Sequence, residues 1–242
     1  MSIEDTQIKT ERGSFATTNV WIFDLDNTLY PSDCNLFAQV DKRMGSFISE
    51  RLGVPFAQAR HLQKSYYHQF GTTLSGLMQI HKMEPQDFLD YVHDIDLSNV
   101  PEHPELAQAI RLLPGRKLIY TNGSKRHGER VAEKLGVLHE FDDICSIETC
   151  DYVPKPEREA FDKMTRRFNV SGHRAAMFED LPHNLEAPHA MGMTTILVHS
   201  DYMDHPVQRS MRNWTKSPDH VHHMTDNLCE FLKNETGHCH AK

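Results

Sequence analysis

The sequence contains no long apolar run, no CxxC pair and no block of basic residues. A membrane-spanning helix needs about 20 apolar residues in succession, so we expect no membrane partner. The five cysteines are odd in number, which argues against a disulfide framework and favours a reducing, cytoplasmic location. The formal net charge of −8 makes the chain a poor ligand for a nucleic acid polymer, because polyphosphate backbones require clustered cations.

The fractions of hydrophobic and charged residues are typical of a soluble globular protein. The chain has 242 residues, of which 38% are hydrophobic and 25% are charged, a length that fits one large domain or a core domain with an insertion. Seventeen histidines are present, many of them late in the chain. Because these late histidines lack the spacing of metal ligands, we interpret the C-terminal region as polar surface rather than a metal site.

The order of hydrophobic patterns predicts the fold class. The continuous apolar run VWIFDL, at 20–25, is typical of a strand buried on both faces of a sheet. About 60 residues of helical periodicity follow it. Beyond residue 98, helical stripes alternate with short apolar runs at 116–123, 142–148, 174–180 and 194–200. This alternation predicts an α/β protein with a doubly wound parallel sheet.

The helical block interrupts that alternation, so we interpret it as an inserted domain. The N-terminal segment is polar and acidic, without the apolar core of a secretory signal, and the C-terminal segment is polar enough to fray. The predicted organisation is a polar N-terminal arm at 1–18, a core domain at 19–32 and 98–225, an inserted helical domain at 33–97, and a polar tail at 226–242.

Four predicted strand ends carry polar residues of particular types. Ligands of open α/β sheets bind beyond the carboxyl ends of the strands, so these residues should converge on one crevice. They are Asp24 and Asp26 after the first strand, Thr121 and Asn122 after the second, Lys155 between two prolines, and Glu179 and Asp180 with Asn184 four residues later.

The combined chemistry of these residues points to phosphate. Carboxylates pressed together repel one another unless a cation lies among them, and hard oxygen ligands suit Mg²⁺. A lysine together with hydroxyl and amide donors would neutralise an anion that has several oxygens. A carboxylate can attack phosphorus, and a second carboxyl nearby could protonate the leaving oxygen and then deprotonate water.

The same residues resemble a known family. DLDNT is similar to the first motif, DxDx(T/V), of the haloacid dehalogenase-like phosphohydrolases. TNG, the lysine before Pro156, and FEDLPHN resemble the second, third and fourth motifs, in the family's order. The helical block resembles the cap that one subclass inserts after the first strand. The fourth motif departs from the common form, because Glu179 and Asn184 stand where many members have other residues.

The resemblance implies a role for each motif residue and Mg²⁺ as the cofactor. Asp24 would be the nucleophile and a metal ligand, and Asp26 the general acid and base, with its backbone carbonyl on the metal. Thr121 and Asn122 would bind phosphate oxygens, and Lys155 would steady Asp24 and the phosphate. Asp180 would complete the metal site, with Glu179 beside it, and Asn184 is expected to orient a neighbour.

A narrower resemblance concerns the substrate. DLDNTLYP, YYHQFGTTLSGLM and YVHDIDLSNVPEHPEL look like segments of the pyrimidine 5′-nucleotidase branch of this family. This implies a small phosphate ester, a nucleoside monophosphate such as UMP or CMP, as the partner. Thr72 and Thr73 could bind substrate or cap the next helix. Tyr30, Tyr66 and Tyr67 could stack on a base, although Tyr66 lies on an apolar stripe. His93 is expected near the hinge or the cap edge.

Other functions are compatible with part of the pattern. A phosphatase of another small metabolite would share every motif. A phosphomutase keeps both acids but protects the aspartyl phosphate from water, whereas a dehalogenase has no need of Asp26. A receiver-like signalling module also pairs acids with a lysine, but it is about half this length and lacks the helical insertion. A relative that only binds ligand would not need the complete motif set.

Overall fold

The computed structural model describes residues 13–200, 211 and 214–239. Within these residues the core is a six-stranded sheet in the order β3-β2-β1-β4-β5-β6, and every paired neighbour is parallel. The predicted doubly wound α/β class is therefore confirmed. The strands are β1 (Val20–Phe23), β2 (Arg116–Tyr120), β3 (Asp143–Cys145), β4 (Ala175–Glu179), β5 (Thr194–Val198) and β6 (His223–Thr225).

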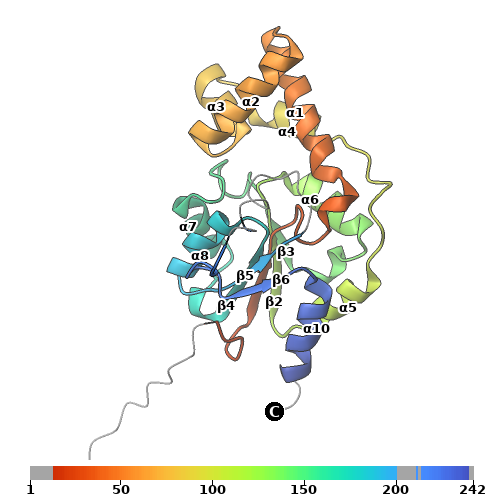
Figure 1. Cartoon of the computed structure of the whole chain (residues 1–242), viewed down its shortest axis with the longest axis vertical. Coiled ribbons are helices and arrows are strands. Elements are labelled where there is room, and N and C mark those ends of the chain that lie inside the picture. The colour runs from red at the N-terminus through yellow and green to blue at the C-terminus, as the bar shows by residue number, and fades with distance from the viewer. Residues whose placement is uncertain (1–12, 201–210, 212–213, 240–242) are drawn as a thin grey trace, which may run out of the picture.

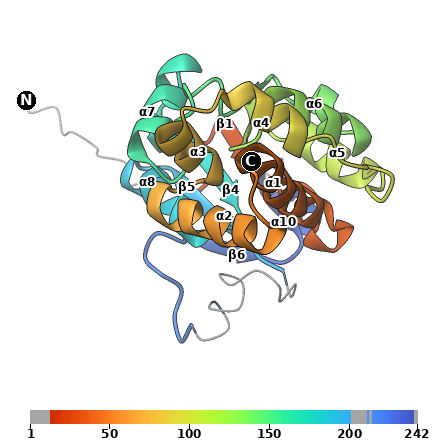
Figure 2. The same ribbon diagram turned by 90° about the horizontal axis from the view of Figure 1, so that it is seen from above.

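Helices cover both faces of this sheet because alternate residues of each strand face opposite layers. In β1, Ile22 belongs to an apolar cluster with Phe161 of α7 (Arg158–Arg167), and Leu185, next to α8 (Glu186–Ala190), lies in the same cluster. Trp21 and Phe23 belong to the apolar cluster of the opposite layer. That layer contains α5 (Pro104–Arg111), α6 (Lys125–Lys134) and α10 (Leu228–Cys239). Figures 1 and 2 show helices on both faces of the sheet.

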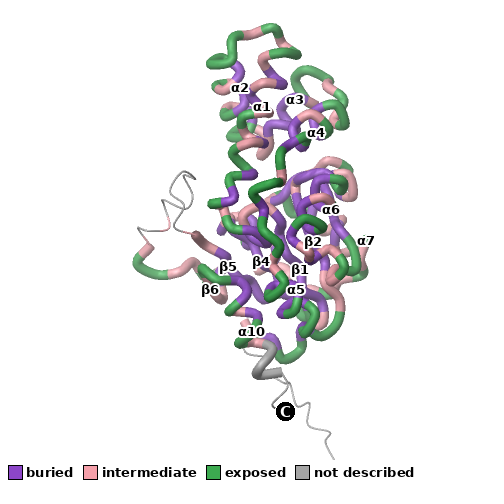
Figure 3. The backbone as a smooth tube through the Cα atoms, turned by 90° about the vertical axis from the view of Figure 1, so that its right-hand side faces the viewer, coloured by how far each residue is buried: buried purple, intermediate pink, exposed green. Residues whose placement is uncertain are grey.

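Four helices between β1 and β2 stand over the carboxyl edge of the sheet (Figure 1). They are α1 (Leu36–Leu52), α2 (Phe56–Phe70), α3 (Thr73–His81) and α4 (Pro85–Val92). Their inward side chains, such as Phe47, Ala59 and Leu77, are fully or almost fully buried. In Figure 3, buried and exposed stretches of the tube alternate along these helices. We call these four helices the cap. Predicted domain boundaries at 33 and 97 remain a proposal.

Two expectations about the chain ends are corrected. The predicted tail at 226–242 instead contains α10, and Leu232 on this helix is fully buried in the core. Its apolar residues Leu228, Phe231 and Leu232 all lie in the first five positions, and the polar residues that follow made the segment resemble a tail. At the other end, residues 1–12 lie outside the described part of the chain, but Phe15, within the predicted arm, stacks on Trp21 with ring centroids 5.5 Å apart.

Two of the late histidines, His222 and His223, lie at the β6 edge of the sheet. The strand β6 had not been expected, and His222 beside it has its Nδ1 2.9 Å from the Thr195 hydroxyl. His223 Nε2 lies 2.6 Å from the carbonyl of Gly13.

Among the described residues, no helix is both long and apolar enough to cross a membrane.

Candidate active site

Strand register brings the acidic strand ends together. Phe23 of β1 pairs with Phe178 of β4, and the rings of the two residues stack at 4.5 Å. The Asp24 amide then donates to the Phe178 carbonyl at 2.9 Å, so Asp24 lies beside Glu179. Because β1 and β4 flank the point where the strand order reverses, this edge is the expected ligand crevice of an open α/β sheet.

Lys155 lies between the acids of the two strands. Its ammonium is 2.6 Å from Asp24 Oδ1 and 2.8 Å from Glu179 Oε1, and it also donates to the Tyr120 carbonyl at 2.9 Å. The Lys155 side chain is only 1% exposed. All three ammonium donors are thus directed to protein oxygens, and this buried ion cluster fixes the geometry of the Asp24 carboxylate.

Glu179 is held on both of its oxygens. Asn184 Nδ2 donates to Oε1 at 2.6 Å, and the Leu181 amide donates to Oε2 at 2.7 Å. Asn184 therefore orients a neighbouring acid, as expected. The Asn184 carbonyl oxygen is buried and has no hydrogen-bond partner among the described residues, so it is available to a ligand or a bound water.

The donor set of the site suits a hard divalent cation. Asp24, Glu179 and Asp180 are all buried, and each offers a carboxylate oxygen within 4.8 Å of the others. Burial, followed by the charge of Glu179, raises the pKa of Asp180 well above its usual range. Burial also raises the pKa of Asp24 to about 7, although Lys155 opposes the shift. Clustered carboxylates that resist ionisation are typical of a site completed by a cation.

We expect Mg²⁺ to stabilise the protein more at about pH 8 than at about pH 6. With its pKa raised above the unfolded value, Asp24 retains a proton when folded, so the metal-free protein loses free energy of unfolding as pH rises from about 4 to about 7. A cation binds the ionised form, so its stabilising effect grows over the same interval. Thermal melts with and without Mg²⁺ should give a shift of roughly 5–10 °C at the higher pH. The prediction is contradicted by equal shifts at both pH values, or by an undiminished shift in Asp180→Asn.

Asp26 is held by two residues that sequence reasoning did not assign to it. The Tyr30 hydroxyl donates to Asp26 Oδ1 at 2.6 Å, and His127 Nε2 of α6 lies 3.2 Å from the same oxygen. Burial favours protonated Asp26, but His127 and then Tyr30 outweigh it and lower the pKa of this carboxyl to about 2. Tyr30 is 1% exposed, so the idea that it stacks on a base is wrong.

The residues after β2 build a short loop beside these acids. Thr121 Oγ1 accepts a hydrogen bond from the Gly123 amide at 2.8 Å. The Asn122 side chain bonds the backbone of Lys155 in both directions, donating at 3.0 Å and accepting at 2.8 Å. The amide side chain of Asn122 therefore positions the segment that carries Lys155, while a phosphate-binding role of Thr121 and of the Asn122 backbone stays a prediction.

The two candidate threonines of the cap make local contacts. Thr72 caps α3, since its hydroxyl accepts from the Ser75 amide at 3.0 Å. Thr73 is buried and donates to the Gln63 carbonyl at 3.4 Å. Thr72 and Thr73 were expected either to bind substrate or to cap the next helix, and Thr72 makes the capping contact. Tyr66 packs inside the cap against Phe70 and bonds His81 at 2.7 Å, whereas Tyr67 is 42% exposed.

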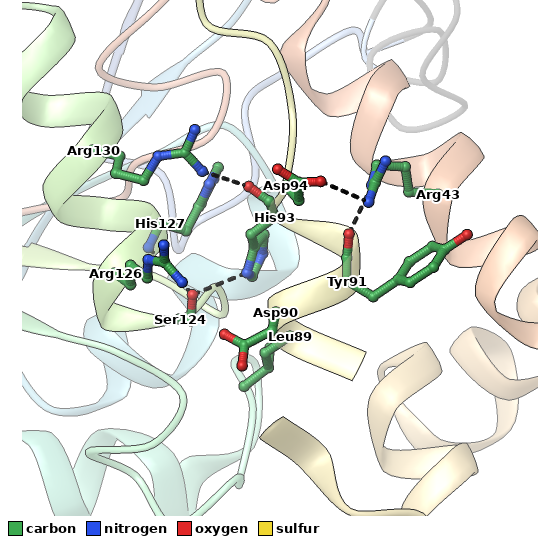
Figure 4. A pocket seen from close by; sticks show the side chains of 10 residues that line it. All are labelled: Arg43, Leu89, Asp90, Tyr91, His93, Asp94, Ser124, Arg126, His127 and Arg130. Atoms are coloured by element: carbon green, nitrogen blue, oxygen red, sulfur yellow. Dashed lines mark hydrogen bonds and ion pairs between the residues drawn. The ribbon is translucent and has the colours of Figure 1, made fainter. Parts of the chain in front are cut away.

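A cavity of about 310 Å³ lies where the cap joins the core, between α4 and α6 (Figure 4). His93, at the C-terminal end of α4, lines it and stacks on His127 with ring centroids 4.3 Å apart. Burial, followed by the charge of His127, lowers the pKa of His93 to about 3. His93 is therefore neutral, and it lies at the cap edge where the sequence placed it.

The comparisons with known proteins agree with the fold and the motifs. The family model of haloacid dehalogenase-like hydrolases matches residues 18–192. A HAD phosphatase from Thermococcus onnurineus, 17% identical, superposes with a TM-score of 0.58 over 90% of this chain and 97% of that one. The HAD hydrolase YfnB from Bacillus subtilis, solved bound to magnesium, is 15% identical with a TM-score of 0.56, over 90% of this chain and 98% of that one. At these identities the likeness concerns the fold.

A sequence relative extends the comparison. Phosphate metabolism protein 8 of Saccharomyces cerevisiae is 26% identical over 197 residues, which are 74% of this chain. The match spans 60% of the length of that yeast protein. Because the family model matches residues 18–192, more than half of the chain, and all four motifs lie within that range, this chain belongs to the haloacid dehalogenase-like hydrolases.

Proposed function

We propose that the protein is a Mg²⁺-dependent phosphomonoesterase that works through an aspartyl phosphate on Asp24. One observation carries this proposal: the Asp24 carboxylate lies in a buried cluster with Lys155, Glu179 and Asp180, while a second acid, Asp26, is held separately two residues away. Two carboxyls in such different surroundings suit two different duties, a nucleophile and a proton carrier.

Asp24, Glu179 and Asp180 are the side chains that would hold Mg²⁺. When bound, the ion would supply positive charge that keeps these carboxylates ionised and offsets the charge of a phosphoryl group. Lys155 is placed to restrain the Asp24 carboxylate, since the distance between them is 2.6 Å. The hydroxyl of Thr121 and the backbone of Asn122 lie at the neighbouring strand end, where they can bind phosphoryl oxygens.

The reaction divides into two displacements at phosphorus. In the first, an Asp24 oxygen bonds to phosphorus while the ester oxygen leaves and takes a proton from Asp26. In the second, water attacks the same phosphorus, gives a proton to Asp26, and releases phosphate from Asp24. His127 and Tyr30 lower the pKa of Asp26 to about 2, so the carboxylate must take up a proton from the solvent as the negatively charged ester binds, because a nearby anion raises a carboxyl pKa.

The proposed substrates are pyrimidine nucleoside monophosphates of the UMP and CMP type. This part of the proposal rests on the cap and motif segments that resemble the pyrimidine 5′-nucleotidase branch. Related proteins described as a HAD phosphatase and as a predicted phosphoglycolate phosphatase support phosphate esters as the class. The latter, from Haemophilus somnus, is 16% identical with a TM-score of 0.59, over 91% of this chain and 99% of that one.

Phosphate release from a broad panel of esters tests the proposal. UMP and CMP should be hydrolysed with Mg²⁺, faster than purine nucleotides and sugar phosphates. Preference for another ester would retain the phosphatase and reject the nucleotide assignment. Failure to hydrolyse any ester in the panel with Mg²⁺ would reject the phosphatase itself.

Changing Asp26 to asparagine should lower the rate of hydrolysis most for esters that have a poor leaving group. An alkyl ester needs a proton on its departing oxygen, whereas p-nitrophenolate leaves without one. We expect kcat to fall about 10²–10⁴-fold for UMP and less for p-nitrophenyl phosphate, measured by steady-state kinetics on both esters. Equal losses for the two esters would contradict the assignment of Asp26 as the acid.

A further inference from the structure

Two cysteines are in contact on the loop that joins β3 to α7. Cys145 is the last residue of β3, and Cys150 follows five positions later, within a series of turns. Both thiols are free, and both residues are fully buried. Their sulfur atoms are 3.6 Å apart. Because the sulfurs of a disulfide are about 2.05 Å apart, a movement of roughly 1.5 Å would bring these two to bonding distance.

The Cys145 end of this loop supports the proposed phosphate site. The Cys145 carbonyl accepts a hydrogen bond from the Thr121 amide at 2.9 Å, and the Ile147 amide donates to the Gly123 carbonyl at 3.1 Å. These two bonds hold both ends of the short loop from Thr121 to Gly123. In a close-packed interior a displacement of Cys145 is passed on to its neighbours, so it would shift the residues that are proposed to bind phosphoryl oxygens.

The Cys150 end of the loop lies beside the lysine of the site. Cys150 Sγ is 3.8 Å from the Tyr120 hydroxyl, and the Tyr120 carbonyl accepts from the Lys155 ammonium at 2.9 Å. The Cys150 carbonyl accepts from the Val153 amide at 3.1 Å, two residues before Lys155. The two cysteines therefore lie at the ends of a segment that contacts the phosphate loop on one side and the lysine on the other.

The turn after Cys150 is the part of the loop best able to rearrange. Asp151 and Tyr152 have φ angles of 51° and 62°, in the left-handed region that side chains other than glycine rarely adopt. Lys163 holds the turn, because its ammonium lies 3.0 Å from Asp151 Oδ2 and donates to the Cys150 carbonyl at 3.3 Å. Asp151 is exposed, so the turn borders solvent, and local opening there would admit a small molecule.

The two thiols differ in their surroundings. Cys150 Sγ lies 3.6 Å from the Ala160 carbonyl, which can only accept a hydrogen bond, so the Cys150 proton has a partner there and Cys145 is left to donate to Cys150. The hydrogen bond from Cys145 lowers the pKa of the Cys150 thiol although burial opposes it, and the same bond raises the pKa of Cys145. Cys150 is the more reactive of the two, because the thiolate is the nucleophile.

We propose that Cys145 and Cys150 form a redox modification site, at which hydrogen peroxide closes a disulfide and thereby inactivates the phosphate site. The Cys150 thiolate attacks one peroxide oxygen, so that an S–O bond forms, the O–O bond breaks, and the departing hydroxide takes up the proton that Cys150 released. Cys145 then attacks the Cys150 sulfur, the S–O bond breaks, and water leaves with the Cys145 proton. The two sulfurs lose two electrons, which reduce the peroxide to two molecules of water.

Peroxide treatment of the purified protein tests this inference. Free thiols are alkylated afterwards, and mass spectrometry is used to weigh the tryptic peptide 135–158, which contains both cysteines. We expect this peptide to lose two hydrogen atoms and to resist alkylation, and dithiothreitol should reverse both changes. Phosphate release with Mg²⁺ should fall about tenfold or more and recover with dithiothreitol, because a displacement of about 1 Å at a reaction site lowers the rate by such factors.

Matched variants separate this pair from the other thiols. Cys145→Ser keeps a donor to Cys150 but cannot form the disulfide, so oxidation should stop at a sulfenic acid on Cys150 that dimedone traps. Cys150→Ser should give no adduct on Cys145. Cys229→Ser is the control, since Cys229 is buried on α10 in the opposite layer, and it should respond to peroxide as the wild type does. Thermal melts confirm folding, and the alanine variants replace any serine variant that does not fold.

The outcomes distinguish this inference from the proposed function, on which only the change in turnover rests. The inference is overturned, and the phosphatase stands, if esters are hydrolysed but the disulfide does not form or does not change the rate. An equal loss of phosphate release in Cys150→Ser after peroxide also overturns it. If the reduced protein hydrolyses no ester, the phosphatase fails, and calorimetry with inorganic phosphate and Mg²⁺ decides: weaker binding after oxidation supports the redox site, and unchanged binding overturns it.

Discussion

Replacing Asp24 with asparagine is expected to remove phosphate release almost completely while leaving the protein folded. The amide has nearly the shape of the carboxylate, so its oxygen can still accept from Lys155, which lies 2.6 Å from Asp24 Oδ1 in the structure. An amide oxygen is a far weaker nucleophile towards phosphorus. We expect kcat/KM to fall by about 10⁴-fold or more, the size of effect seen when an essential nucleophile is lost.

Two further measurements make this result specific. Mass spectrometry after mixing with substrate should detect a phosphate adduct on the wild-type chain and none on Asp24→Asn. The thermal melt of the variant should match or exceed that of the metal-free wild type near neutral pH, because burial already raises the pKa of Asp24 to about 7. Retention of most of the activity in a purified, folded variant would refute Asp24 as the nucleophile.

Replacing Lys155 with methionine should produce the largest loss of stability of any single change in the site. The lysine ammonium compensates two buried carboxylates, Asp24 and Glu179, and both ion-pair partners are at most 8% exposed. Removing one member of a buried ion cluster leaves uncompensated charge, which costs about 3–5 kcal/mol in free energy of unfolding. Urea unfolding of the metal-free protein measures the difference.

The cause of this loss can be separated from simple packing. Methionine fills similar space, so the cost should come from charge and should shrink as pH falls from about 8 to about 5, where protonation of Asp24 relieves the repulsion. The double variant Lys155→Met with Glu179→Gln should lose less stability than the sum of the two single variants. A loss independent of pH and strictly additive in the double variant would mean that Lys155 acts through packing alone.

Much of the fold could be predicted from local pattern. The continuous apolar run before Asp24 and the alternating segments after residue 98 indicated a parallel sheet, and the structure confirms that class. Helix α10 and strand β6 could not be predicted in the same way. The strand β6 is three residues long, and the apolar residues of α10, among them the fully buried Leu232, are mostly confined to its first five positions. Tertiary packing stabilises both elements, and a local pattern does not reveal it.

The candidate site likewise contains residues that the sequence predicts and one, His127, that it does not. Asp24 and Asp180 stand at strand ends and Lys155 in the loop between β3 and α7, and their residue types and order point to metal and phosphate chemistry. His127 has no such signal, since a histidine in the first turn of a helix is unremarkable by itself. Its ring reaches Asp26, 101 positions earlier in the chain, only because α6 packs against the sheet at β3.

By itself, the sequence determined the class of sheet, the family and the acidic and basic residues of the motifs, because these depend on residue type, periodicity and order. Only the tertiary structure decided what each acid touches: Asn184 on Glu179, and Tyr30 and His127 on Asp26. Such contacts join residues far apart in the chain. Their distances are set by strand register and helix packing, which no local pattern encodes.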